Sequence, residues 1–427
     1  MRQLPRWPLL ALYLGFPVWW LLGLGAFIWP VLALPMLGSL LLRGRVRFPA
    51  GFGLWFAFLA WMLGSGIELD SAARVLGWSY RASLYLAAAV LFLYVYNIPR
   101  DRLPPRTIAL VLTGFWAFVV VGGYLGLLFP QGSFTTVVEH LMPASLMENS
   151  LVSSMVHPAF AQTSGAILGV APRPQAPFTY TNEWGGNFAL LVPMVLTAMS
   201  QTRSGGGRIL LALLLPVGLV PAALSLNRGL FLSLGAGLVY AALRYAIRGR
   251  VKAMIGITVV VAVAGAVFAV LPVKQLLEER LTTSATNQTR ASLYAEARDR
   301  VAASPLLGYG APRPSDVGGG SPSVGTQGQF WMVLFSHGIP GAALFTAFFL
   351  WAVWRTRRAL TGPWFWGHVT LVIATVQLPI YGLLPAQLFT VMIALAVALR
   401  GEEALARRRA PARGRATTPS IVGTRPA

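Results

Sequence analysis

The stretch ILLALLLPVGLVPAALSLNRGLFLSLGAGLVYAAL (209–243) decides the class of fold. Its two apolar runs, 209–225 and 229–243, are close to the length that a helix needs to cross a bilayer. Arg228 stands at their junction, and an arginine that faced lipid at mid-bilayer would cost about 3 kcal/mol. The stretch therefore predicts two membrane helices joined by a tight turn, and it poses the question of what Arg228 does.

The same pattern continues along all 427 residues. Hydrophobic residues make up 56% of the chain and charged residues only 11%, whereas about a quarter of a soluble domain is charged. We expect an all-α polytopic membrane protein with about twelve transmembrane helices in one domain over 1–400. The predicted spans are 9–23, 26–42, 50–66, 82–97, 107–129, 184–200, 209–225, 229–247, 253–272, 329–353, 364–380 and 386–399.

The net charge of +21 follows this topology. If the N-terminus is cytoplasmic, the inner connections such as RGRVR (43–47) and RTRR (355–358) hold the whole basic excess, as the positive-inside rule requires. The charge therefore predicts cytoplasmic termini and contact with anionic membrane lipids, and no nucleic acid. The absence of cysteine excludes disulfides and Cys-ligated metals.

Two long outer loops and a tail interrupt the apolar pattern. The loop 130–183 is weakly amphipathic and predicts short helices that lie in the membrane interface. In the loop 273–328, the Gly/Ser-rich stretch 318–329 is flexible enough to form a hinge. The basic, low-complexity tail 401–427 is expected to be disordered and cytoplasmic.

One helix is clearly predicted inside the second loop, over RASLYAEARDRVAASP (290–305). Leu293, Ala297 and Val301 recur at helical spacing, so they predict one buried face. Glu296 precedes Arg300 by four residues, the spacing of a helical ion pair. Pro305, at the end of the range, terminates the helix.

The outer segments concentrate arginine. No Walker A, HExxH or GxSxG motif occurs in a suitable context, and histidines are too few for a His-rich metal site. The planar guanidinium binds phosphate through two hydrogen bonds and keeps its charge. The cluster thus predicts a site for a lipid-linked phosphate or diphosphate. It comprises Arg228, Arg280, Arg290, Arg298 and Arg300, with Glu183, Glu296 and Asp299 among them.

Four segments resemble the O-antigen ligase/polymerase-like membrane glycosyltransferases. SLNRGL (225–230) is similar to that family's S-R-G stretch at an outer helix end. TNQTRASLYAEARDRVAASPLLGYGAP (286–312) is similar to its second-loop motif of an arginine, an amphipathic helix and P-L-x-G-x-G. FTYTNEWGGNFALLVP (178–193) and GTQGQFWMVLFSHGIPG (325–341) look like the starts of two of its membrane helices.

The resemblance implies a GT-C-like fold and a reaction. A glycan would pass from a polyprenyl (undecaprenyl-type) diphosphate carrier to a glycan or lipid acceptor hydroxyl, outside the bacterial cytoplasmic (inner) membrane, with no cofactor and no metal. Arg228 and Arg290 match the family's arginines and would stabilise the leaving diphosphate. Gln327 takes the place of the family's histidine and cannot accept a proton. Either Glu183 is the base instead, or the reaction depends on leaving-group stabilisation alone, or catalysis has been lost. Further candidates for substrate binding are Arg280, Arg298, Arg300, Asn182 and Tyr294.

Simpler interpretations stay open for these residues. Arg228 could extend to the lipid headgroups from a helix end, and Glu183 could complement a helix dipole. Arg298 and Arg300 could be solvated charges, and His337 could be a packing residue. At the level of the whole protein, a transporter or flippase and a non-catalytic envelope scaffold are the alternatives, and ligase and polymerase are not distinguished.

Overall fold

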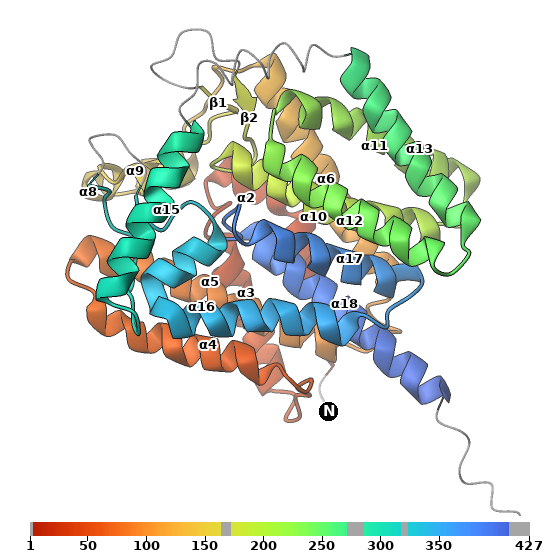
Figure 1. The fold of residues 1–427 in the computed structure, drawn as a ribbon, viewed down its shortest axis with the longest axis horizontal. Coiled ribbons are helices and arrows are strands. Elements are labelled where there is room, and N and C mark those ends of the chain that lie inside the picture. Colours follow the sequence, from red (N-terminus) through yellow and green to blue (C-terminus); the bar gives the residue numbers. More distant parts are fainter. Residues whose placement is uncertain (1–2, 164–171, 271–285, 317–322, 410–427) are drawn as a thin grey trace, which may run out of the picture.

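The computed structural model describes residues 3–163, 172–270, 286–316 and 323–409, and this part of the chain is mostly helical (Figure 1). The longer helices pack side by side around a continuous apolar core. They are α3 (Ile28–Leu41), α4 (Gly53–Gly64), α5 (Ala72–Asn97), α6 (Pro105–Leu128), α10 (Thr181–Gln201), α11 (Gly205–Leu224), α12 (Arg228–Ala246), α13 (Val251–Val270), α16 (Gln329–Thr356), α17 (Gly362–Gln377) and α18 (Ala386–Arg409).

Each predicted span overlaps a helix. The first span is divided into α1 (Trp7–Leu14) and α2 (Phe16–Leu22), which meet at Gly15. Five described helices, α5, α6, α11, α12 and α16, are long and apolar enough to cross a membrane, and three shorter apolar helices accompany them. The fold agrees with an all-α membrane protein, while the number of twelve crossings stays a prediction.

The first outer loop folds as the sequence suggests, with one addition. Short helices follow one another at one end of the bundle, where α8 and α9 are labelled (left in Figure 1). The short 3-10 helix η1 (Ser65–Glu68) follows α4. A small antiparallel hairpin, which periodicity did not predict because each strand has only two residues, pairs Ala161 with Pro174. The elements are α7 (Val137–Leu141), α8 (Ala144–Met147), α9 (Ser150–Val156), β1 (Ala161–Gln162) and β2 (Arg173–Pro174).

The helix predicted in the second outer loop is α15 (Thr286–Ala303), which lies at the same end of the molecule (Figure 1). Its predicted apolar face is buried, with Leu293, Ala297 and Val301 at most 5% exposed. This face packs against Phe335 of α16, so the spacing rule holds although the helix lies outside the main core. The predicted hinge 318–329 falls partly outside the described residues.

Helix α16 is broken where the second loop crosses it. Gly338 has a φ of 68°, which disfavours any residue with a side chain, and it interrupts the helical hydrogen bonds. The chain after α15 uses the freed groups: the Tyr309 amide donates to the Phe335 carbonyl at 3.0 Å, and the Ile339 amide donates to the Pro305 carbonyl at 2.8 Å. The backbone after α15 thus lies in close contact with the backbone of α16. This contact explains why glycines are needed in the motif that follows α15.

The last helix leaves the bundle at the end opposite to α15 (lower right in Figure 1). Its first half lies in the core, and residues 388–399 are at most 3% exposed. The helix continues past residue 400 to Arg409, so the predicted tail 401–427 begins inside a helix. Residues 410–427 lie outside the described part, and the domain boundary stays a prediction.

Candidate active site

A cavity of about 1560 Å³ opens at the end of the bundle where α8, α9 and α15 gather. Residues from distant parts of the chain line it: the α2–α3 turn, the start of α5, the first outer loop, the start of α10, and the approach to α16. One wall is apolar and aromatic. It includes Trp20, Phe27, Trp29, Leu76, Phe178 and Met332.

Four arginines line the cavity, from three separate elements: α5, β2 and α15. Arg81 lies in the third turn of α5 and donates one Nη1 hydrogen bond to the Gly77 carbonyl of its own helix at 3.0 Å. Arg173 belongs to β2, and its Nε donates to the Ser225 carbonyl at 2.8 Å. These two join Arg74, at the start of α5, and Arg290, at the start of α15, around one space.

Arg290 is the cavity arginine whose motif the sequence singled out. Its Nε is buried and has no hydrogen-bond partner among the described residues. Arg290 and Arg173 both interact electrostatically with the Tyr381 hydroxyl. Elements β2 and α15 therefore place these two cations near the same tyrosine. A buried guanidinium nitrogen without a partner is costly unless a ligand or water satisfies it.

Glu183 also lines the cavity, in the first turn of α10 and just before the predicted span 184–200. Its carboxylate accepts a hydrogen bond from the Thr179 amide at 3.2 Å. Burial nevertheless raises the pKa of this carboxyl to about 7. Tyr80 lies within electrostatic reach of both Glu183 and Arg81, so acid and cation are near neighbours on the cavity wall.

Arg228 lies elsewhere: it is exposed in the first turn of α12 and is not part of the cavity lining. Its neighbour Asn227 is the buried residue of the motif. The Asn227 amide donates to the Thr181 carbonyl at 3.0 Å, and its oxygen accepts from the Tyr381 hydroxyl. In this arrangement the SLNR stretch ties α12 to the start of α10.

The remaining predicted site residues differ in their position relative to the cavity. Asn182 and Gln327 line the cavity, and the Gln327 side chain donates to the Thr326 hydroxyl at 3.2 Å. Tyr294 lies outside the lining, where its hydroxyl donates to the Gln327 carbonyl at 3.0 Å and positions that residue. Arg280 lies outside the described residues.

Two predicted arginines of α15, Arg298 and Arg300, are not among the residues that line the cavity. Arg298 is 75% exposed and pairs with Asp299 at 2.9 Å. Arg300 pairs with Glu296 at 2.7 Å, which is the helical ion pair expected from their spacing. Neither is placed to bind a substrate in the cavity.

The buried histidine of α16 is a packing residue. His337 is 4% exposed, and its Nδ1 lies 2.6 Å from the Ser65 hydroxyl. His337 is not part of the cavity lining, whereas Gln327 is. Within the described ranges, no group of three or more His, Asp or Glu side chains is arranged to hold a metal ion.

Arg81 and Arg173 are site residues that the sequence reasoning missed. Arg81 stands immediately before the predicted span 82–97, and an arginine within an apolar helix is itself a signal. Arg173 lies in a Pro-rich loop with no motif around it, so only the hairpin reveals its place.

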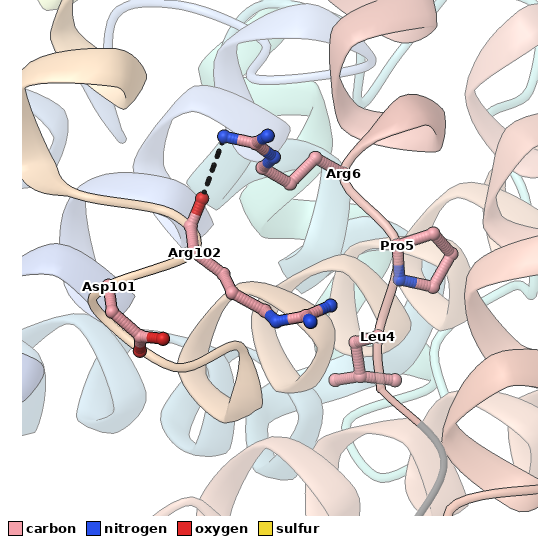
Figure 2. Close-up of a pocket in the computed structure, with 5 residues that line it drawn as sticks. All are labelled: Leu4, Pro5, Arg6, Asp101 and Arg102. Atoms are coloured by element: carbon pink, nitrogen blue, oxygen red, sulfur yellow. Dashed lines mark hydrogen bonds between the residues drawn. The ribbon is translucent and has the colours of Figure 1, made fainter.

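A second pocket, of about 410 Å³, lies at the predicted inner loop 98–106 (Figure 2). Arg6 donates to the Arg102 carbonyl there at 3.1 Å, and no dashed line joins Asp101 to either guanidinium group. Only five residues form this pocket, and it has no aromatic wall. It lacks the combination of apolar wall, acid and cations that marks the larger cavity.

Comparison with known proteins finds a family match over one part of the chain. Residues 209–346 match the family model described as O-antigen ligase, a range that contains Arg228, Arg290 and the part of α16 with the break at Gly338. No curated protein matches the chain. The match supports the resemblance: over these residues the chain is similar to the O-antigen ligases, a family that suggests a glycosyltransferase-like enzyme of surface polysaccharide biosynthesis in the bacterial inner membrane.

Proposed function

We propose that this protein transfers a glycan from a polyprenyl diphosphate carrier to an acceptor hydroxyl at the outer face of the membrane, in surface polysaccharide ligation or polymerisation. One observation carries the proposal: Arg81, Arg173, Arg290 and Glu183 line a single cavity that also has an apolar, aromatic wall. A lipid-linked diphosphate has the matching parts, an isoprenoid chain, two phosphates and a sugar.

The arginines would stabilise the leaving group. In the transfer, the acceptor oxygen forms a bond to the anomeric carbon, and the bond from that carbon to the diphosphate oxygen breaks. The electron pair stays on the diphosphate, whose charge therefore grows in the transition state. Fixed cations beside that oxygen lower the barrier without reorganising, and the unpartnered Nε of Arg290 offers a hydrogen bond for it.

Glu183 would accept the proton of the acceptor hydroxyl. A carboxyl with a pKa near 7 is half ionised at neutral pH and is basic enough to act as a general base. Gln327, which also lines the cavity, would hold the acceptor by hydrogen bonding and take no proton. This division of roles accounts for the missing histidine at that position.

Arg228 keeps a proposed role on the strength of its motif alone. Arg228 is the cation nearest in sequence to Ser225. The Ser225 carbonyl accepts the hydrogen bond from Arg173. We propose that Arg228 attracts the anionic carrier at the cavity edge, where an exposed cation acts by long-range attraction.

The test is transfer from a purified polyprenyl diphosphate oligosaccharide, with the full-length protein in nanodiscs. We expect Arg290→Ala to lower kcat by about 10²-fold, the usual loss when one donor to a developing anion is removed. Arg298→Ala is the matched control, since this arginine lies on the same helix, is exposed and is outside the cavity. Equal turnover in both variants would remove Arg290 from the site. Flux of the carrier in proteoliposomes without any glycan product would favour a flippase.

A further inference from the structure

Asp70 joins two arginines that belong to distant parts of the chain. It lies between η1 and α5, and its Oδ1 accepts a hydrogen bond from Nη1 of Arg74, one helical turn later. Its Oδ2 accepts from Nη2 of Arg313 at 2.8 Å, and Arg313 follows α15 in the second outer loop. One carboxylate thus bridges α5 and the second loop.

Arg74 makes the bridge tighter by a second set of bonds. Its Nη2 donates to the Tyr309 carbonyl and, at 3.1 Å, to the Ala311 carbonyl. Arg313 lies over the Tyr309 ring, with its guanidinium carbon 4.3 Å from the ring centroid. The segment 309–313 is therefore held to the start of α5 through both its backbone and its side chains.

This segment is part of the cavity wall. Arg74, Ala311 and Pro312 all line the cavity, next to Arg290 and Gln327 of the same loop region. On its other side the segment rests on α16, where Tyr309 stacks on Phe335 with ring centroids 4.9 Å apart. Segment 309–313 therefore has contacts on both sides, with α5 and with α16.

We propose that Asp70 is a positioning residue, which fastens Arg74 and Arg313 into a clamp that holds segment 309–313 in place as a wall of the cavity. The catalytic part of this inference rests on the proposed glycan transfer, whereas the structural part does not. Asp70 is 56% exposed, and exposed ion pairs contribute little to global stability. Removal of its charge should therefore loosen the wall and leave the rest of the fold unchanged.

The structural test is hydrogen exchange of the full-length protein in nanodiscs. In Asp70→Asn we expect the amides of Tyr309 and Gly310 to exchange about tenfold faster or more, because local opening governs their protection. Asp299→Asn is the matched control: it removes the same charge from an exposed ion pair of α15 outside the cavity lining. An unchanged melting temperature in both variants shows that the effect is local.

Coupling between the two ends of the clamp gives a second measurement. Arg313→Gln should raise the same exchange rates. In the double variant Asp70→Asn/Arg313→Gln, these rates should exceed those of the more affected single variant by less than about twofold, because the effects of two partners in one network do not add. In the transfer assay, Asp70→Asn should raise KM for the carrier about fivefold and change kcat less than twofold, as expected for lost binding geometry.

The outcomes separate the two proposals. Exchange rates in Asp70→Asn equal to those in Asp299→Asn, or fully additive effects in the double variant, would overturn the clamp. If the wild-type protein transfers no glycan, the proposed function fails, and the exchange measurements still decide the clamp. A fall of kcat by about fivefold in Asp70→Asn, with KM unchanged, would contradict a role in positioning.

Discussion

Arginines at the two ends of this molecule have different surroundings. At the predicted inner end they donate to backbone carbonyls at the termini of neighbouring helices: Arg43 to Asn97 at 2.7 Å, and Arg244 to Arg357 at 2.6 Å. Such carbonyls have no partner inside their own helix, and the negative end of the helix dipole favours a cation there. The inner arginines therefore fasten helices together.

At the cavity, Arg74 and Arg173 also donate to backbone carbonyls of other segments, but Arg81 and Arg290 do not follow this pattern. Arg81 donates to a carbonyl of its own helix, and Arg290 keeps a buried nitrogen without a partner among the described residues. The comparison shows that arginine content alone does not reveal a site. What marks the cavity is that its cations share an enclosed volume with an acid and an apolar wall.

The two pockets show the same contrast. The inner pocket in Figure 2 holds two arginines and an aspartate, yet its five residues come from only two short segments. The outer cavity gathers charged side chains from α5, β2, α10 and α15. Convergence of distant segments on one space is what a substrate with several chemical parts requires.

The largest effect on activity is expected when the acid of the cavity, Glu183, is removed. We expect Glu183→Gln to lower kcat by about 10³-fold, within the range for loss of a general base. The wild-type rate should rise as the pH increases through about 7, because the carboxyl must lose its proton to act, and the variant should lose this dependence. Glu68→Gln is the control, a carboxyl outside the cavity lining. An unaltered pH profile in Glu183→Gln would assign the base to another group.

A smaller effect is expected for the exposed arginine of the SLNR motif. Arg228→Ala should reduce kcat/KM by about tenfold or less at low salt, and the loss should shrink at high salt because exposed charges are screened. Measuring kcat/KM at two ionic strengths, beside Arg290→Ala, tests this ranking. A loss in Arg228→Ala that exceeds the loss in Arg290→Ala at both salts would place Arg228 at the reacting atoms.

The smallest effect is expected at the inner end and should concern stability alone. Arg43→Ala loses its hydrogen bond to the Asn97 carbonyl, so we expect a loss of about 1 kcal/mol in unfolding free energy. Turnover should stay unchanged. Arg45→Ala is the control, an exposed neighbour with no hydrogen bond to a described residue. Lower turnover at full stability in Arg43→Ala would mean that the two ends are coupled.

Much of the architecture was predictable because the membrane imposes it. A helix satisfies its own backbone in lipid, so apolar runs of sufficient length give helices wherever they occur. The amphipathic spacing of Leu293, Ala297 and Val301 also predicted the buried face of α15. The division of the first span at Gly15 has a local signal in Pro17, at the start of α2, that the sequence analysis did not use. The two-residue hairpin was not predictable, because it depends on pairing between separate segments.

The candidate site was predictable only in part. Arg290, Glu183, Asn182 and Gln327 line the cavity as a group, and each stands at or near a helix start that the sequence marks. The positions of Arg298 and Arg300 outside the cavity follow from helix rotation, which is fixed by the apolar face of α15.

The sequence by itself determined the class of the protein, the helical segments and the family resemblance, because each depends on composition, periodicity or short motifs. Only the tertiary structure decided which charges meet. Arg81, Arg173 and Arg290 are distant along the chain, and the cavity that they line exists through packing alone. The same packing left Arg228 outside the lining and made its neighbour Asn227 the buried link between α10 and α12. Local sequence carries no information on such distances, since they depend on how whole helices turn and cross.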